Sequence, residues 1–109
     1  MTASFAVVTV TYSSGDYLHN FLRTLTEASS QTPQVVIADN GSTDGAPEKA
    51  ATDYDNVTLV ETGGNIGYGG AVNRGVAEID PAVEFIVVAN PDVEWSPGAI
   101  DELLEAAKR

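Results

Sequence analysis

Short apolar runs alternate with segments of helical periodicity along the whole chain, and this alternation constrains the fold most. The apolar runs predict strands over 5–10, 35–38, 57–60 and 85–89, and helices are predicted over 16–28, 47–54, 71–79 and from 97 onward. Strands separated by helices form parallel sheets with helices on both faces. We therefore expect an α/β fold: a Rossmann-like three-layer sandwich with a mainly parallel sheet.

The predicted elements account for residues 1–109 as one domain, whose last helix runs to the C-terminus. Within the first helix, Asp16 is the candidate N-cap and Tyr17 begins the apolar stripe, with His19 beside it and exposed to solvent. We expect Trp95 to be a packing anchor. The apolar face of the last helix is predicted to contain Ile100, Leu103 and Leu104.

The charge balance restricts the possible ligands. The chain has 5 Lys and Arg against 16 Asp and Glu, a net charge of -11. Nucleic acid is therefore not an expected partner. A phosphate-bearing ligand would need backbone N–H groups, a helix N-terminus or a bound cation to hold it. The chain has no cysteine, which excludes disulfides and thiol catalysis.

A polar loop, 39–45, follows the second predicted strand. Ligands of open parallel sheets bind at the carboxyl ends of the strands, which is where this loop lies. Asp39 can accept a hydrogen bond from the N3–H of a pyrimidine base, and Asp44 is expected to cap the following helix or turn. The alternative interpretation is a tight turn without a ligand.

A glycine-rich segment, 63–75, precedes the third predicted helix. Its glycines allow a close approach of the backbone to a ligand, and the helix N-terminus after them favours an anion. Asn73 and Arg74 are predicted in the first turn of that helix. The segment is neither the dinucleotide fingerprint nor a P-loop, since Val72 occupies the third glycine position and no Gly-Lys-Ser/Thr follows. A flexible connection is the alternative.

The fourth predicted strand is followed by Asn90-Pro91-Asp92. A carboxylate at a strand end is a candidate ligand for Mg²⁺ or Mn²⁺, which often bind one or two protein carboxylates together with substrate phosphates and water. Such an ion would supply the cation that the acidic chain lacks. The alternative is an exposed turn.

Together these segments resemble the inverting family-2 glycosyltransferases of the GT-A fold, over nearly the whole chain. The matching segments are 10–14, 38–45, 65–73 and 90–93, in the family's order and spacing. The resemblance implies a nucleoside pocket lined by Thr11 and Tyr12, in which Asp39 recognises the nucleobase. It also implies metal binding by Asp92, and a hydrogen bond from Asn90 to the ribose or sugar. The remaining donor-binding positions are Asn65, Gly67, Gly69, Gly70 and Asn73.

The Asn-Pro-Asp and Gly-Tyr-Gly-Gly segments resemble bacterial rhamnosyltransferases of cell wall biogenesis. That implies a dTDP- or UDP-sugar donor, a lipid-linked glycan acceptor, and a cytoplasmic location, peripheral at the inner face of the plasma membrane in the full-length protein. The family's general base lies beyond the position of Arg109, so we expect a truncated donor-binding half that is inactive alone and self-associates through its uncovered edge. The alternative is a non-catalytic nucleotide-binding or interaction module.

Overall fold

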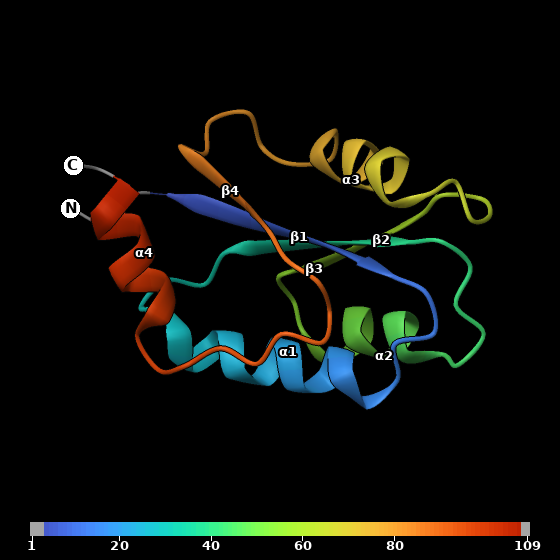
Figure 1. Cartoon of the computed structure of the whole chain (residues 1–109), viewed down its shortest axis with the longest axis horizontal. Coiled ribbons are helices and arrows are strands. Elements are labelled where there is room, and N and C mark those ends of the chain that lie inside the picture. Colours follow the sequence, from blue (N-terminus) through green and yellow to red (C-terminus); the bar gives the residue numbers. More distant parts are fainter. Residues whose placement is uncertain (1–3, 108–109) are drawn as a thin grey trace.

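The computed structural model describes residues 4–107 and confirms the predicted order of elements, with strands and helices alternating along the chain (Figure 1). The strands are β1 (Phe5–Thr11), β2 (Gln34–Asp39), β3 (Val57–Glu61) and β4 (Phe85–Val88). The helices are α1 (Asp16–Ala28), α2 (Ala46–Asp53), α3 (Tyr68–Val76) and α4 (Ala99–Ala107).

The four strands form one parallel sheet in the order β3-β2-β1-β4. In the register of the sheet, Thr11 of β1 pairs with Asp39 of β2, and Asp39 pairs with Glu61 of β3. The carboxyl ends of these three strands therefore lie side by side, and the loops that follow them gather at the right-hand end of Figure 1. The α/β fold with a parallel sheet is confirmed.

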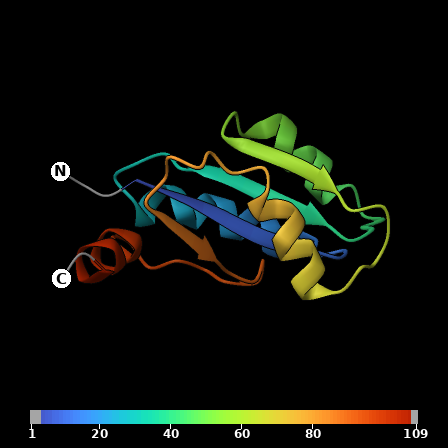
Figure 2. The ribbon, with the colours of Figure 1, turned by 90° about the horizontal axis from the view of Figure 1, so that it is seen from above.

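Helices cover both faces of the sheet, and the alternation of side chains along β1 separates two cores. Phe5 and Val7 pack in a cluster with residues of α1, α2 and α4, whereas Ala6 and Val8 pack on the opposite face toward α3. Figure 2 shows α3 in front of the sheet and α1 behind it. Because β1 is buried on both faces, its residues are apolar or small throughout, as predicted for a central parallel strand.

Two details of α1 differ from the prediction. The N-cap is Gly15, with φ 57°, and Asp16 is the first residue of the helix. Gly15 donates its backbone N–H to Asp44 Oδ2 at 2.8 Å, so a carboxylate from another loop holds the N-cap residue in place. Tyr17 is exposed, because the buried face of α1 begins at Leu18.

The last helix and the last strand are less buried than expected. The helix α4 begins at Ala99, after Gly98 with φ 76°, and its Leu103 is exposed while Ile100 and Leu104 are buried. The strand β4 alternates between half-buried and exposed residues, and Val88 is 43% exposed on the same face of the sheet as Val8, the face on which α3 packs against β1 and β2. No helix within residues 4–107 is long and apolar enough to span a bilayer.

Gly75 allows α3 to pack closely on the sheet. A methyl group added there would lie 2.9 Å from Val8 Cγ1, in a place where Val8 is fully buried. We expect Gly75→Ala to lower the free energy of unfolding by about 1–2 kcal/mol, because an overpacking cost of about 1–3 kcal/mol exceeds the gain of up to about 1 kcal/mol in helix propensity. Urea unfolding measures this. Gly69→Ala is the matched control, because a methyl group there meets no atom within 4 Å; an equal loss in both variants would contradict the packing argument.

Candidate functional site

The candidate site lies at the carboxyl ends of the strands. Tyr12, directly after β1, is 63% exposed, and its ring lies beside Gly41 of the β2–α2 loop, where an added Cβ would be 4.0 Å from Tyr12 Cε1. An exposed ring held against a glycine offers a flat apolar surface on which a base can stack. The place of Tyr12 at a nucleoside pocket stays a prediction.

Asp39, the last residue of β2, has a buried carboxylate held by three neighbouring donors. Its Oδ1 accepts the Thr11 hydroxyl at 2.8 Å and the Ser42 hydroxyl, and the backbone N–H of Ser42 is shared between both carboxylate oxygens at 3.2 Å. Asp39 is 5% exposed, so these bonds replace most of its hydration. Its Oδ2 accepts only the shared N–H and keeps acceptor capacity for a ligand.

Thr11 does not line the surface as the resemblance implied. Its side chain is fully buried beneath the strand ends, and its hydroxyl donates to Asp39. The reason is register: Thr11 and Asp39 are paired neighbours on adjacent strands, so their side chains point to the same face of the sheet. Thr11 can therefore act on a ligand only through Asp39.

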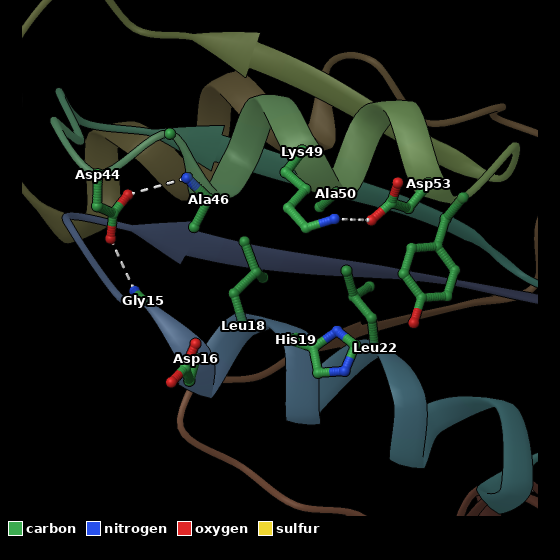
Figure 3. A pocket seen from close by; sticks show the side chains of 12 residues that line it. Gly15, Asp16, Leu18, His19, Leu22, Asp44, Ala46, Lys49, Ala50 and Asp53 are labelled. Carbon is green, nitrogen blue, oxygen red and sulfur yellow. Dashed lines mark hydrogen bonds and ion pairs between the residues drawn. The ribbon is translucent and has the colours of Figure 1, made fainter.

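Asp44 confirms its predicted capping role. Its Oδ1 accepts the backbone N–H of Ala46, the first residue of α2, at 3.1 Å, while Oδ2 accepts the N–H of Gly15 (Figure 3). One carboxylate thereby joins the N-terminal ends of two helices, where the helix dipoles favour a negative charge. Ser13 strengthens this connection, because its backbone N–H donates to Ser42 Oγ at 2.8 Å. The loops after β1 and β2 are thus held together.

Asn40 and Thr62, neither of which was predicted as a site residue, connect the site to the glycine-rich segment. Both are buried. Thr62 Oγ1 donates to Asn40 Oδ1 at 2.8 Å and also lies 2.7 Å from the carbonyl oxygen of Gly64, and Asn40 Nδ2 donates to the carbonyl of Gly67 at 3.2 Å. These bonds fix the glycine-rich loop to the end of β2. The sequence held only a weak signal for this pair, namely that a polar residue directly follows each of the neighbouring strands β2 and β3.

The glycine-rich loop ends at the N-terminus of α3. Gly67 is the N-cap with φ 84°, a conformation that side chains disfavour, and its N–H donates to Asn65 Oδ1 at 3.0 Å. The first N–H groups of a helix have no partner inside the helix. A Cβ at Gly69 would meet no atom within 4 Å, so the backbone there is open to a ligand, whereas Gly70 is covered by Ile66. Asn65 shapes the loop through its Oδ1.

Asn73 and Arg74 lie further along α3 than predicted. The helix begins at Tyr68, not at Ala71, so Arg74 falls in its last turn, about 9 Å along the axis from the N-terminal end. Placing both residues in the first turn was therefore wrong, and Arg74 is not beside the helix N-terminus. Both side chains are exposed. The role of Asn73 in donor binding stays a prediction.

Asn90 and Asp92 lie in an exposed turn after β4, closed by a hydrogen bond from the Val93 N–H to the Asn90 carbonyl at 3.1 Å. Within residues 4–107 no group of three or more His, Cys, Asp or Glu side chains is placed to enclose a metal ion. A single exposed carboxylate does fit a divalent ion that takes most of its ligands from phosphates and water. Asp92 is such a carboxylate, so it fits a divalent ion of this kind.

A cavity of about 390 Å³ lies elsewhere, between α1 and α2 (Figure 3). Its floor is apolar, with Leu18, Leu22 and Ala50. Two of its charged residues pair with each other: Lys49 Nζ lies 2.7 Å from Asp53 Oδ2, and this hydrogen bond raises the pKa of the Lys49 ammonium. His19 also lines this cavity, and its exposure confirms the prediction that it faces solvent. No candidate donor-binding residue lines it.

Trp95 is confirmed as a packing residue. Its ring packs edge-to-face on Phe21 of α1, with centroids 5.6 Å apart, and its backbone N–H donates to Thr24 Oγ1 at 3.0 Å. The segment between β4 and α4 is therefore held against α1.

Comparisons with known proteins show the family to which this fold belongs. The profile of the family described as Glycosyl transferase family 2 matches residues 6–109. The chain is 49% identical to an N-acetylglucosaminyl-diphospho-decaprenol L-rhamnosyltransferase of Mycobacterium tuberculosis, over 100% of the chain and 38% of that protein.

Solved structures share the fold. A mannosyltransferase from Pyrobaculum calidifontis in complex with GDP-mannose and Mn²⁺ superposes with a TM-score of 0.82 at 25% identity, covering 99% of this chain and 32% of that one. S. aureus TarS residues 1–349 in complex with UDP-GlcNAc superposes with a TM-score of 0.77 at 23% identity, covering 96% of this chain and 30% of that one.

Proposed function

The chain belongs to glycosyl transferase family 2, and we propose that it forms the donor- and metal-binding part of an enzyme that transfers rhamnose, with inversion, from a nucleoside diphosphate sugar to a polyprenyl-linked glycan. The 49% identity to the mycobacterial rhamnosyltransferase supports this choice of sugar and acceptor. The chain spans 38% of the length of that relative, so the complete transfer reaction belongs to the proposal.

The observation that carries the proposal is the arrangement at the ends of β1 and β2. Tyr12 presents an exposed ring beside Gly41, and Asp39, which is bonded to Ser42 of the same loop, keeps acceptor capacity on Oδ2. Thymine and uracil carry a hydrogen on N3 that a carboxylate oxygen can accept. A pyrimidine nucleotide stacked on Tyr12 and bonded to Asp39 satisfies both groups.

The diphosphate requires compensation of its charge in a chain with a net charge of -11. The open backbone at Gly69 and the N-terminus of α3 offer N–H donors, and Asp92 would hold Mg²⁺ or Mn²⁺ against the phosphates. The Mn²⁺ in the related mannosyltransferase supports this assignment. When bound, the ion supplies stabilisation of the charge on the departing nucleoside diphosphate. Asn90, in the same turn, would contact the ribose or sugar.

A panel of donors tests the proposal. We expect the chain to bind dTDP-rhamnose in the presence of Mg²⁺ more tightly than GDP-mannose or ADP-glucose, measured by isothermal titration calorimetry. Binding of dTDP-rhamnose but not dTDP-glucose would support rhamnose as the sugar. Equal affinity for purine and pyrimidine donors would contradict the proposed site. If nucleoside diphosphates without a sugar bind as tightly as every sugar donor, the alternative of a nucleotide-binding module is favoured.

We further propose that the protein acts at the cytoplasmic face of the plasma membrane, where its lipid-linked acceptor would be reached. Support comes from the relative whose name specifies a decaprenol-linked substrate. Fractionation of the source cells with an antibody to this chain tests the location; recovery only in an extracytoplasmic fraction would contradict it.

Self-association of the chain is a separate expectation, and a second copy is the proposed partner. Ile86 and Val88 of β4 are 41% and 43% exposed on one face of an edge strand, and uncovered apolar strand surfaces promote association. Light scattering over a range of concentrations should show mass increasing with concentration, and Ile86→Thr with Val88→Thr should reduce it. Leu103→Ser on α4 is the control. A wild-type chain that stays monomeric throughout would contradict the expectation.

A further inference from the structure

Two threonines of β1 provide a natural comparison. Thr9 and Thr11 are both fully buried and lie on the same face of the strand, two residues apart. The hydroxyl of Thr11 donates to Asp39 Oδ1 at 2.8 Å, whereas the hydroxyl of Thr9 has no hydrogen-bond partner among the described residues. The two side chains therefore share burial and face, and of the two only that of Thr11 is bonded to the Asp39 carboxylate.

The carboxylate of Asp39 is held asymmetrically. Its Oδ1 accepts both hydroxyl donors, from Thr11 and Ser42, while Oδ2 has only a share of the Ser42 backbone N–H. Rotation of the carboxylate would break both hydroxyl bonds, and the buried hydroxyl of Thr11 would be left without a partner. The two oxygens therefore have different functions: Oδ1 is an anchor and Oδ2 is the available acceptor.

We propose that Thr11 and Ser42 are positioning residues that set the base selectivity of this protein, by holding Asp39 so that Oδ2 faces the N3–H of uracil or thymine. The inference rests on the proposed function, because it assumes a pyrimidine nucleotide at Asp39. An ionised carboxylate is an acceptor only. Cytosine has a lone pair on N3, so a fixed Oδ2 excludes it, whereas a mobile carboxylate can turn away and tolerate it.

The burial of Thr11 distinguishes a positioning role from direct contact with the substrate. Thr11 has no exposed surface, so its hydroxyl cannot reach a base itself. Its loss should leave the stacking surface of Tyr12 unchanged and alter only the orientation of Asp39. The expected signature is a change in selectivity between two pyrimidine nucleotides, not a uniform loss of affinity for both.

The test compares the affinities of UDP and CDP in the presence of Mg²⁺, since the two nucleotides differ only at N3 and C4 of the base. We expect the wild-type chain to prefer UDP, and Thr11→Val to reduce this preference about tenfold by removing one hydrogen bond to a charged group. Thr9→Val is the matched control, a buried threonine on the same strand, and should keep the wild-type preference. Thr11→Ser should restore the preference, because it restores the hydroxyl.

The outcomes separate the inference from the proposed function. A wild-type chain without preference for UDP over CDP would overturn base recognition by Asp39. A wild-type preference that Thr11→Val retains would overturn the positioning role alone, as would equal losses for UDP and CDP. If Thr11→Val does not fold, Ser42→Ala tests the second anchor in the half-buried β2–α2 loop, and an unchanged UDP preference there would overturn the inference.

Discussion

Replacing Asp92 with Asn is expected to weaken the binding of dTDP or UDP in the presence of Mg²⁺ by about 100-fold. The chain carries a net charge of -11, and the one basic residue of the candidate motifs, Arg74, lies in the last turn of α3. Without a cation, the carboxylate of Asp92 would repel the diphosphate. With Mg²⁺ between Asp92 and the phosphates, repulsion becomes attraction.

Isothermal titration with Mg²⁺ and with chelator measures this effect. The wild-type chain should bind dTDP tightly only with the metal, and metal and nucleotide should increase each other's affinity by the same factor. In Asp92→Asn both effects should be nearly lost. The matched control is Glu94→Gln, which removes a second exposed carboxylate two residues away and should behave as wild type. Equal affinities of the wild-type chain for dTDP with Mg²⁺ and with chelator would contradict the role given to Asp92.

Asp39→Asn is expected to change the preferred base, the second large effect. Because Thr11 and Ser42 donate to the oxygen at the Oδ1 position, the amide oxygen should take that place and the amide nitrogen the place of Oδ2. An N–H donor at the position of Oδ2 would face the N3–H donor of uracil without forming a hydrogen bond, but it could donate to the N3 lone pair of cytosine. We expect UDP affinity to fall by about tenfold to 100-fold and CDP affinity to rise.

Competition between UDP and CDP in the presence of Mg²⁺ measures this change. Asp16→Asn is the control, because it removes an exposed carboxylate in the first turn of α1. Thermal unfolding of the variants shows whether the fold is kept. A variant that still prefers UDP to the wild-type degree would show that Asp39 does not contact the base.

The strands were predictable because their apolar runs are short, β-branched and bounded by turn residues. The extent of β1 differs from the prediction by one residue, Thr11, a polar residue whose buried hydroxyl donates a hydrogen bond to Asp39. The start of α3 was not predictable in the same way. Gly69 and Gly70 lower helix propensity, yet Tyr68–Val76 is helical because Ala71 and Gly75 pack against the sheet.

In the candidate site, residues that act locally were easier to predict than residues that act across strands. The capping role of Asp44 follows from its position next to α2 and is confirmed. The bond between Thr11 and Asp39, and the network of Asn40 and Thr62, depend on which strands are neighbours and on their register. Register is a property of the assembled sheet, so a single sequence does not reveal these contacts.

The most direct test of the donor site at the strand ends is an NMR titration of the ¹⁵N-labelled chain with dTDP and Mg²⁺. The predicted result is that the amide signals that shift most belong to Tyr12, the loops over 40–42 and 67–70, and the turn at Asn90–Asp92. The α1–α2 cavity, marked by Leu22, Lys49 and Tyr54, should be unaffected. Shifts concentrated at that cavity, or absent from the strand-end loops while binding is saturated, would contradict the central claim.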